Sequence, residues 1–254
     1  SSNDLKGADI RLLLGPFLWD PLEVQEFTPF SSIHMEDPAG FPGSIRIAPF
    51  ADHIFTNDVA VVDSYGTHKT TVVPCLSFND VSGFDMKARA EEYGIGLAGY
   101  AYPSRKVFVE KLIASNPSKT FLLIGDGWTE YNNARITTIP TIPESETLSL
   151  LSSCKMVVCY HRQLTDVNGT HQLPPESVHR GYLEVASGSP VFIDSSREQH
   201  SFSDEVMFYA DVEELNKIIA DATDDPGKYL LLGCLGRERA RKDFTYRIRL
   251  GRIV

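Results

Sequence analysis

The sequence predicts an α/β protein with two domains, each built on a parallel sheet, the first of them short. Three observations lead to this fold class. Short apolar segments rich in β-branched residues recur along the chain, as expected of parallel strands covered on both faces. Segments with helical spacing of apolar residues alternate with them, and short turns separate the elements. A length of 254 residues leaves room for one large domain or two small ones.

The first domain is predicted to span residues 1–80 and to contain four strands. They are expected at residues 10–14, 31–35, 53–56 and 70–74. Asn57 or Asp58 can cap a short helix over residues 59–65, which Gly66 ends. Four strands leave this domain one or two strand–helix units short of a complete doubly wound fold. The polar segment that follows the fourth strand marks the domain boundary.

The second domain is predicted to span residues 81–254 and to be a complete doubly wound domain with six strands. The strands are expected at residues 95–100, 119–125, 134–139, 155–160, 191–193 and 205–210. Helices are expected at residues 104–115, 144–153 and 212–222, and from Pro226 toward the end of the chain. Asp211 is expected to cap the third of these helices.

The segment 174–194 combines the residue types that bind a nucleotide sugar. Ser177 can cap a helix whose free N–H groups suit a phosphate. Glu176 lies at the expected helix start and Glu184 about two turns further, roughly 80° away around the axis. Two such carboxylates can each accept hydrogen bonds from vicinal hydroxyls. Gly188 is expected to end the helix before a buried strand.

Further candidates follow the ends of the predicted strands, where open α/β sheets bind ligands. Each also has a structural alternative. The glycines before Arg105 and Lys106 can let a phosphate approach, or can simply form turns. Gly125 can do the same, and Trp128 can stack on a base or pack in the core. His161 and Arg162 lie at a strand end, although a lone histidine is often a hydrogen-bonded structural residue.

In the first domain, His34 is the best candidate for a group that takes part in chemistry. It ends a predicted strand and is followed by Met-Glu-Asp-Pro, which can also form a plain turn. The other histidines show no ligand spacing, so no metal site is expected. The four cysteines are spread out and are expected to be buried thiols, which fits a reducing cytoplasm.

Charge and hydropathy narrow the classes of partner. The net charge of −10 disfavours broad nucleic-acid binding. Residues 236–252 nevertheless carry +5, which leaves about −15 for the rest of the chain. This basic segment is either a solvated helix end or a seat for an anionic acceptor or partner. No apolar run approaches the ~18 residues of a membrane span, and the N-terminus lacks a signal-peptide pattern, so a cytoplasmic location is expected.

Residues 174–194 resemble the core of GT-B glycosyltransferases, in which a Glu-x7-Glu element precedes a glycine and an apolar strand. More of the chain is similar to the spore-maturation (CgeB-type) group of these enzymes. The similar segments are HMEDP (34–38), HIFTND (53–58), VVPCLSF (72–78), YPSR (102–105), SVHRGYLEVASGSPVFID (177–194), EVMFYADVEEL (205–215) and FTYRIRLGRI (244–253). Together they run from about residue 30 to the end of the chain.

The resemblance implies two Rossmann-like domains that face a cleft, with the donor on the C-terminal one. It implies that Glu184 binds the ribose, that Glu176 binds the donor sugar, and that Arg105 and Lys106 face the diphosphate. Arg180 matches an arginine position of the group. The resemblance implies a nucleotide sugar, most often a UDP-sugar, as the donor substrate. It also implies that no bound metal is needed and that the anomeric configuration is retained. The segment after Glu176 departs from the usual glycine-rich pattern.

The sequence therefore predicts a nucleotide-sugar-dependent glycosyltransferase with Glu176 and His34 as candidate catalytic residues. Its acceptor could be a saccharide, a protein or a modified nucleic-acid base. The short first domain also fits a non-catalytic nucleotide- or carbohydrate-binding protein with the same fold. A third possibility is a sugar-nucleotide epimerase, which would need no acceptor. The oligomeric state cannot be read from the sequence.

Overall fold

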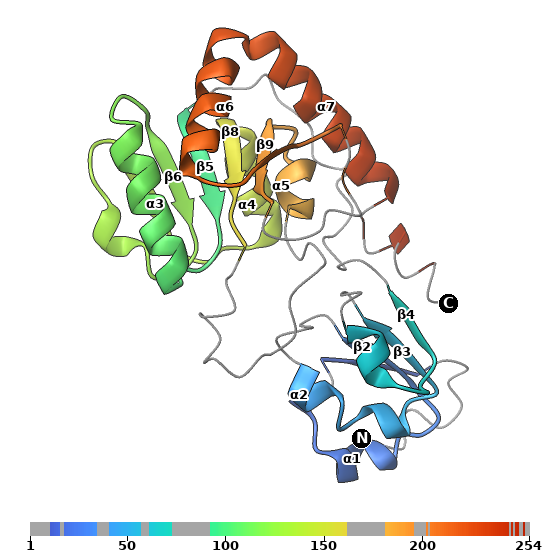
Figure 1. The fold of residues 1–254 in the computed structure, drawn as a ribbon. Coiled ribbons are helices and arrows are strands. Elements are labelled where there is room, and N and C mark those ends of the chain that lie inside the picture. Colours follow the sequence, from blue (N-terminus) through green and yellow to red (C-terminus); the bar gives the residue numbers. More distant parts are fainter. Residues whose placement is uncertain are drawn as a thin grey trace.

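The structure is a computed structural model of the 254-residue chain. It describes residues 11–15, 18–34, 41–56, 61–72, 92–161, 181–195, 202, 204–243, 245, 247–248 and 251. Two parallel sheets organise these residues, one in each half of the chain (Figure 1). The predicted boundary at residue 80 falls outside the described residues and stays a prediction.

The N-terminal sheet has four strands in the order β1-β2-β3-β4, and all three pairs are parallel. The strands are β1 (Leu12–Leu14), β2 (Ser31–His34), β3 (His53–Thr56) and β4 (Thr70–Val72). Short helices connect them, namely α1 (Pro21–Gln25), α2 (Phe41–Ser44), η3 (Ala48–Phe50) and η5 (Asp63–Tyr65). The four predicted strands are confirmed. The helix predicted over residues 59–65 is described from residue 61 on, where it is 3-10 rather than α-helical, and Gly66 ends it as predicted.

The C-terminal sheet has six strands in the order β10-β9-β8-β5-β6-β7, again all parallel. The strands are β5 (Tyr93–Ala98), β6 (Phe121–Ile124), β7 (Ile136–Ile139), β8 (Cys154–Cys159), β9 (Val191–Asp194) and β10 (Met207–Tyr209). The helices are α3 (Pro103–Ser115), α4 (Glu144–Ser152), α5 (Tyr182–Ala186), α6 (Val212–Asp224) and α7 (Pro226–Asp243), and a 3-10 helix η6 covers Thr129–Tyr131. The chain winds outward from β5 in one direction and from β8 in the other, so the predicted doubly wound domain is confirmed.

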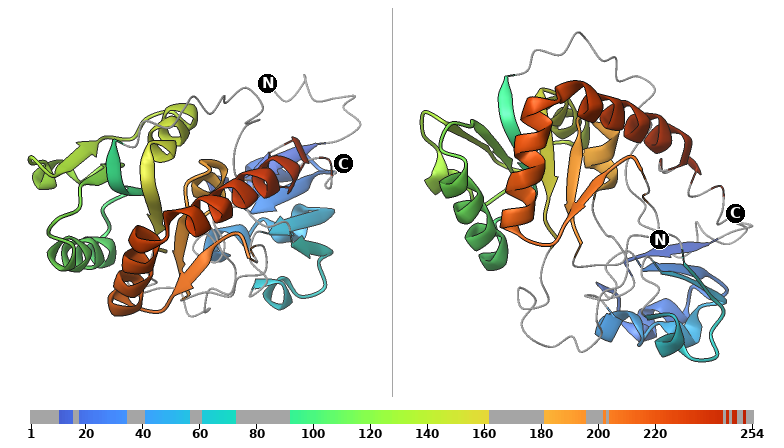
Figure 2. Two further views of the ribbon diagram at one scale, coloured as in Figure 1. Left: turned by 90° about the horizontal axis from the view of Figure 1, so that it is seen from above. Right: turned by 45° about the horizontal axis from the view of Figure 1, so that its top comes forward.

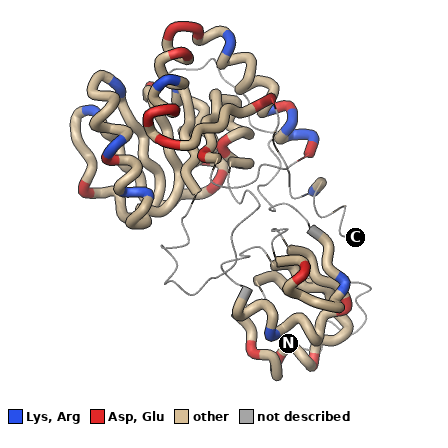
Figure 3. Tube along the Cα trace, in the orientation of Figure 1, with Lys and Arg blue, Asp and Glu red and all other residues tan. Residues whose placement is uncertain are grey.

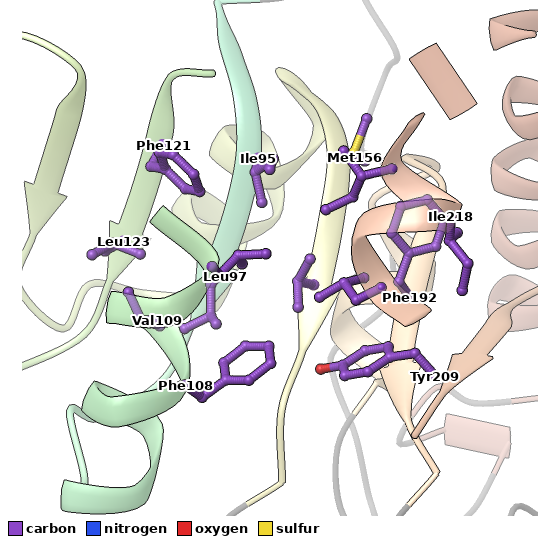
Figure 4. Packing of buried hydrophobic residues seen from close by; sticks show 14 of the residues in the cluster. Ile95, Leu97, Phe108, Val109, Phe121, Leu123, Met156, Phe192, Tyr209 and Ile218 are labelled. Atoms are coloured by element: carbon purple, nitrogen blue, oxygen red, sulfur yellow. The ribbon is translucent and has the colours of Figure 1, made fainter. Parts of the chain in front are cut away.

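Apolar side chains alternate between the two faces of this sheet, and helices cover both. Phe121 and Leu123 of β6 join the cluster beneath α3 and α6, whereas Leu122 and Ile124 join the cluster beneath α4 and α5. Figure 4 shows the first cluster, in which Phe108 of α3 and Tyr209 of β10 stack with their ring centroids 6.0 Å apart. Burial on both faces explains why these strands read as continuous apolar runs in the sequence.

The ends of two helices test the cap predictions. The Asp211 carboxylate accepts a hydrogen bond from the backbone N–H of Glu214 at 2.8 Å, so the predicted cap of α6 is confirmed. Ser177, the predicted N-cap of the helix that carries Glu184, lies outside the described residues. The described helix α5 begins at Tyr182, and its N-cap is Gly181, whose φ of 99° is not helical. Glu184 therefore lies in the first turn of a five-residue helix rather than two turns into a longer one.

Helix α7 packs against the segment that joins α5 to β9 through Gly233. A Cβ atom at Gly233 would lie 2.3 Å from the carbonyl oxygen of Gly188, a backbone atom that cannot move aside easily. Gly233→Ala is therefore expected to lower the free energy of unfolding by about 1–3 kcal/mol, the usual cost of overpacking. Urea unfolding followed by circular dichroism measures this change.

Gly227 on the same helix provides the matched control. A Cβ atom there meets only the Asp225 carboxylate oxygen, at 3.7 Å. Gly227→Ala should leave the free energy of unfolding unchanged or raise it by up to about 1 kcal/mol, because alanine loses less backbone entropy in a helix. Equal effects of the two substitutions would show that close packing at Gly233 does not set its cost.

Candidate functional site

The strand order of the C-terminal sheet reverses between β5 and β8, which are neighbours in space. In doubly wound sheets a ligand binds beyond the carboxyl ends of the strands at this reversal. The segments that leave β5, β6 and β8 here carry the predicted residues Arg105, Gly125, Trp128 and His161. Hydrogen bonds connect these residues to neighbouring strand ends.

Arg105 ties together the two segments that flank the reversal point. Its guanidinium donates to the carbonyl oxygen of Tyr100, after β5, at 2.5 Å. It also donates to the carbonyl oxygen of Tyr160, after β8, at 2.9 and 3.3 Å. The side chain is only 1% exposed. Arg105 thus has a structural role that the sequence did not predict, and its contact with a diphosphate remains a prediction.

Gly125 and Trp128 hold the end of β6 close to the end of β5. The Trp128 indole N–H donates to the carbonyl oxygen of Gly99 at 2.7 Å. Gly125 has a φ of 132°, and a Cβ atom there would lie 2.5 Å from the same oxygen. The glycine is therefore explained by close approach of two backbone segments. Trp128 is fully buried in the core, so of its two predicted roles the packing one describes this structure, and base stacking does not.

His161 is held by the carboxylate of Asp194. The Asp194 Oδ2 atom, at the end of β9, accepts from the His161 backbone N–H at 2.5 Å and from the ring Nδ1 at 2.6 Å. Both side chains are buried. Because the carboxylate accepts, Nδ1 carries a proton, and the orientation of the imidazole is fixed. Asp194 directly follows the strand predicted at residues 191–193, the kind of position at which the sequence predicts site residues.

Glu184 is the carboxylate buried beside the same sheet edge. Its side chain is 3% exposed, and its Oε2 atom accepts from the Gly181 backbone N–H at 3.1 Å. The bond returns from the third residue of α5 to its N-cap, as in one half of a capping box. This contact helps to satisfy a buried charge, which would otherwise be costly.

Lys106 lies next to Arg105 on α3 but points to the surface. Its ammonium group forms an ion pair with the Glu130 carboxylate at 2.7 Å. Such an exposed pair contributes at most about 1 kcal/mol, so it leaves Lys106 available to exchange partners. Arg162, Glu176, Ser177 and Arg180 lie outside the described residues. The predicted proximity of Glu176 to Glu184 is therefore not described.

His34, at the end of β2 in the N-terminal domain, is buried and hydrogen-bonded at both ring nitrogens. Nε2 contacts the Ser32 hydroxyl at 2.7 Å, and Nδ1 contacts the Tyr65 hydroxyl. Burial lowers the pKa of His34 from 6.5 to about 4. The ring is therefore neutral at pH 7, with one nitrogen donating and the other accepting.

The lowered pKa of His34 predicts a loss of stability in acid. Between pH 6.5 and pH 4 the unfolded chain binds a proton that the folded protein does not, so the free energy of unfolding falls as the pH falls. The effect approaches about 3 kcal/mol at pH 4. Unfolding of the native protein and of His34→Gln should be compared at pH 7 and pH 4. The native protein should lose about 3 kcal/mol more than the variant, and parallel pH curves would contradict the assignment.

Among the described residues, no group of three or more histidine, cysteine or acidic side chains is placed to hold a metal ion. Within the same part of the chain, no helix combines the length and the apolar character of a membrane span.

Two parallel α/β domains, the second doubly wound, define the GT-B architecture. Residues 105–254, more than half of the chain, match the model of the glycosyl transferase-like family. The chain belongs to this family and is a glycosyl-transferring enzyme. No curated protein sequence is significantly similar to it.

Several solved structures share the fold at low sequence identity. The sucrose-phosphate synthase of Thermosynechococcus elongatus is 16% identical, with a TM-score of 0.65, and the match covers 98% of this chain and 74% of that one. HepE of Anabaena, in complex with UDP-glucose, is 13% identical, with a TM-score of 0.66 and coverages of 99% and 79%. An α-glucosyltransferase in complex with UDP and a DNA containing an HMU base is 10% identical, with a TM-score of 0.61 and coverages of 89% and 71%.

Proposed function

We propose that the protein transfers a sugar from a nucleotide-sugar donor to an acceptor, with the donor bound at the carboxyl ends of β5, β6, β8 and β9. The observation that carries the proposal is the family match, which begins at Arg105 and spans the segments after β6, β8 and β9. Further support comes from two proteins of the same fold, whose structures contain UDP-glucose or UDP. A UDP-sugar is therefore the proposed donor substrate, and no metal or other cofactor is proposed.

Each residue of the proposed site is assigned to one part of the donor. Glu184 accepts hydrogen bonds from the ribose hydroxyls, and Glu176 from hydroxyls of the donor sugar. Lys106 and Arg180 supply positive charge to the diphosphate, while Arg105 keeps the β5 and β8 segments in place beside it. The buried Asp194–His161 pair offers a fixed imidazole at the same edge. Such preset groups stabilise the charge that develops on the leaving diphosphate.

The proposed reaction breaks the bond between the anomeric carbon of the donor and the diphosphate oxygen. The nucleoside diphosphate leaves with the electron pair, and the acceptor oxygen forms a new bond to that carbon and passes its proton to the departing diphosphate oxygen. The anomeric configuration is retained. His34 is proposed to act on the acceptor side through the Ser32 and Tyr65 hydroxyls, whose positions its two ring nitrogens fix. A pKa of about 4 keeps the ring neutral at pH 7, so His34 is not proposed as a base.

Finer assignments rest on the resemblance of the sequence. The spore-maturation (CgeB-type) group is the proposed subfamily, and the cytoplasm is the proposed location. The acceptor is proposed to be a saccharide, a protein or a modified nucleic-acid base. Two observations support including a modified nucleic-acid base among the acceptors. One protein of the same fold was solved with a modified DNA, and residues 236–252 of this chain carry a net charge of +5.

A thermal-shift panel tests the donor site first. UDP, GDP, TDP, CMP and ADP are added with and without sugars, each at a high concentration. A ligand at ~100 times its dissociation constant adds about 2.7 kcal/mol to the free energy of unfolding. We expect a clear shift with UDP and with at least one UDP-sugar. A response to none of the nucleotides would contradict the proposed donor site.

Turnover is then measured as release of the nucleoside diphosphate from the UDP-sugar that binds. Release that depends on one acceptor class identifies that class and supports transfer. Conversion of the donor sugar without any acceptor would instead indicate an epimerase. Binding with neither reaction, across all three acceptor classes, would favour a binding protein over the proposed transferase.

A further inference from the structure

The outward face of α7 exposes a group of large apolar side chains. Leu230, Leu231 and Leu235 are 38%, 60% and 48% exposed, and the thiol of Cys234 lies among them. At 100° per residue these four positions share one side of the helix. The opposite side, which includes Gly233, packs against the domain. In the views of Figure 2, α7 runs along the outside of the C-terminal domain.

The neighbouring helix α6 exposes polar residues and buries its apolar ones, as expected of a helix face in contact with water. Its exposed positions include Glu213, Glu214 and Lys217, and its large apolar residues Leu215, Ile218 and Ile219 are buried. Of these two helices only α7 exposes large apolar residues, whereas Val107 of α3 and Leu18 and Leu22 of the N-terminal domain are exposed elsewhere. Apolar side chains grouped on a surface in this way mark a contact site when polar residues border them.

Charges of opposite sign border the apolar group at its two ends. Asp221 and Asp224 lie in the last turn of α6, and Asp225 follows them just before α7. The first turn of α7 itself carries Lys228, which forms an exposed ion pair with Asp221 at 2.8 Å. Arg239, Arg241 and Lys242 lie in the last turns of α7 (Figure 3). Arg239 and Arg241 also form exposed ion pairs with Asp243 and Glu238. Exposed pairs of this kind are weak and do not commit these side chains to one partner.

We propose that the outward face of α7 binds the same face of a second copy of this chain, with the two helices antiparallel. A twofold axis between residues 232 and 233 sets the apolar groups against each other. It also sets the acidic turn before each α7, which carries Asp224 and Asp225, toward the basic end of the other α7, which carries Arg241 and Lys242. A self-complementary patch of this kind is what a twofold dimer requires. Parallel helices would place like charges together.

The distribution of charge favours a second copy over an anionic membrane surface. The acidic turn at one end and Glu238 within the face would be repelled by anionic lipid, whereas both find basic partners in the antiparallel pair. The 18 residues of α7 span about 27 Å. The contact is therefore small compared with standard interfaces, and we expect a dissociation constant on the order of micromolar.

Cys234 allows a direct test of the geometry. With the axis between residues 232 and 233, the two Cys234 positions lie about 5 Å apart along the helix direction. The test uses a chain with Cys75→Ser. Cys234 is exposed, whereas Cys154 and Cys159 are buried. This chain should form a disulfide-linked dimer through Cys234 on mild oxidation. The matched control carries Cys75→Ser, Cys234→Ser and Lys217→Cys, which moves the thiol to the exposed face of α6. It should cross-link at least tenfold more slowly, and equal rates would overturn the proposal.

Sedimentation of the reduced chain over a range of concentrations tests association without cross-linking. The native chain should shift from monomer to dimer between about 1 and 200 μM. Leu231→Glu with Leu235→Glu should weaken association at least tenfold while leaving the unfolding transition in place. Arg241→Glu should weaken it too, and adding Asp224→Lys should restore it. A native monomer at 200 μM, or a dimer that ignores these substitutions, would overturn the proposal, as would binding of the monomer to anionic vesicles through the same leucines.

Discussion

Arg105→Ala is expected to lower the free energy of unfolding of the C-terminal domain by about 1–3 kcal/mol. The substitution removes the guanidinium that donates to the carbonyl oxygens of Tyr100 and Tyr160. The Tyr100 oxygen keeps the backbone N–H of Tyr102 as a donor at 2.9 Å, so only the Tyr160 oxygen is counted, at the usual cost of about 1–3 kcal/mol for a buried acceptor that loses a partner. Urea unfolding measures the loss. A lysine at this position should recover only part of it, because a single ammonium cannot reproduce the fork of donors.

The neighbouring residue supplies the control for Arg105. Lys106 belongs to the same turn of α3, but its ion pair with Glu130 is exposed. Lys106→Ala should therefore change the free energy of unfolding by at most about 1 kcal/mol. If the two alanine variants unfold alike, Arg105 does not hold the two segments together. If Arg105→Ala remains folded, it should weaken UDP binding more than uridine binding, and an equal loss of both would contradict a role beside the diphosphate.

Glu184→Ala is expected to raise the dissociation constant of the nucleotide at least a hundredfold. A carboxylate that accepts from two ribose hydroxyls provides two charge-assisted hydrogen bonds, each worth about 1.5–3 kcal/mol. The same substitution removes the acceptor of the Gly181 N–H, so it should also lower the free energy of unfolding by about 1 kcal/mol. Isothermal titration with UDP and thermal unfolding measure the two effects separately.

Glu184→Gln distinguishes the ribose role of Glu184 from its role in α5. Glutamine keeps an oxygen that can accept from the Gly181 N–H, so the stability should be close to that of the native protein. It loses the negative charge, so nucleotide affinity should still fall, by less than in the alanine variant. An alanine variant that is folded and binds UDP as tightly as the native protein would show that Glu184 does not contact the ribose.

The fold could be predicted from the sequence because its strands are buried on both faces. Val191, Phe192 and Ile193 alternate between two cores, so the strand appears in the sequence as an unbroken apolar run. The cap at Asp211 was also predicted, because the side chain and its N–H partner lie three residues apart. Signals of this kind are local, and the sequence displays them directly.

The parts that failed depend on backbone geometry that side-chain patterns do not record. The start of α5 is set by the left-handed conformation of Gly181, its N-cap. The sequence shows only a glycine before an apolar run, which does not predict that conformation. The acceptors of Arg105 are backbone carbonyls, one of them 55 residues away. Any residue type could supply such an oxygen. The structural role of Arg105 therefore became visible only when β5 and β8 were placed side by side.

The pairing of β5 with β8 also determines when this site can come into being. These neighbours are joined by the whole of α3, β6, β7 and α4, since Tyr93 pairs with Cys154. Closing so long a loop costs entropy before the contacts between β5 and β8 can form. Such pairings are therefore late events in folding. A chain emerging from the ribosome lacks part of the proposed donor site until β8 and β9 have been made. If the donor binds there as proposed, a chain interrupted before Asp194 should have no affinity for it.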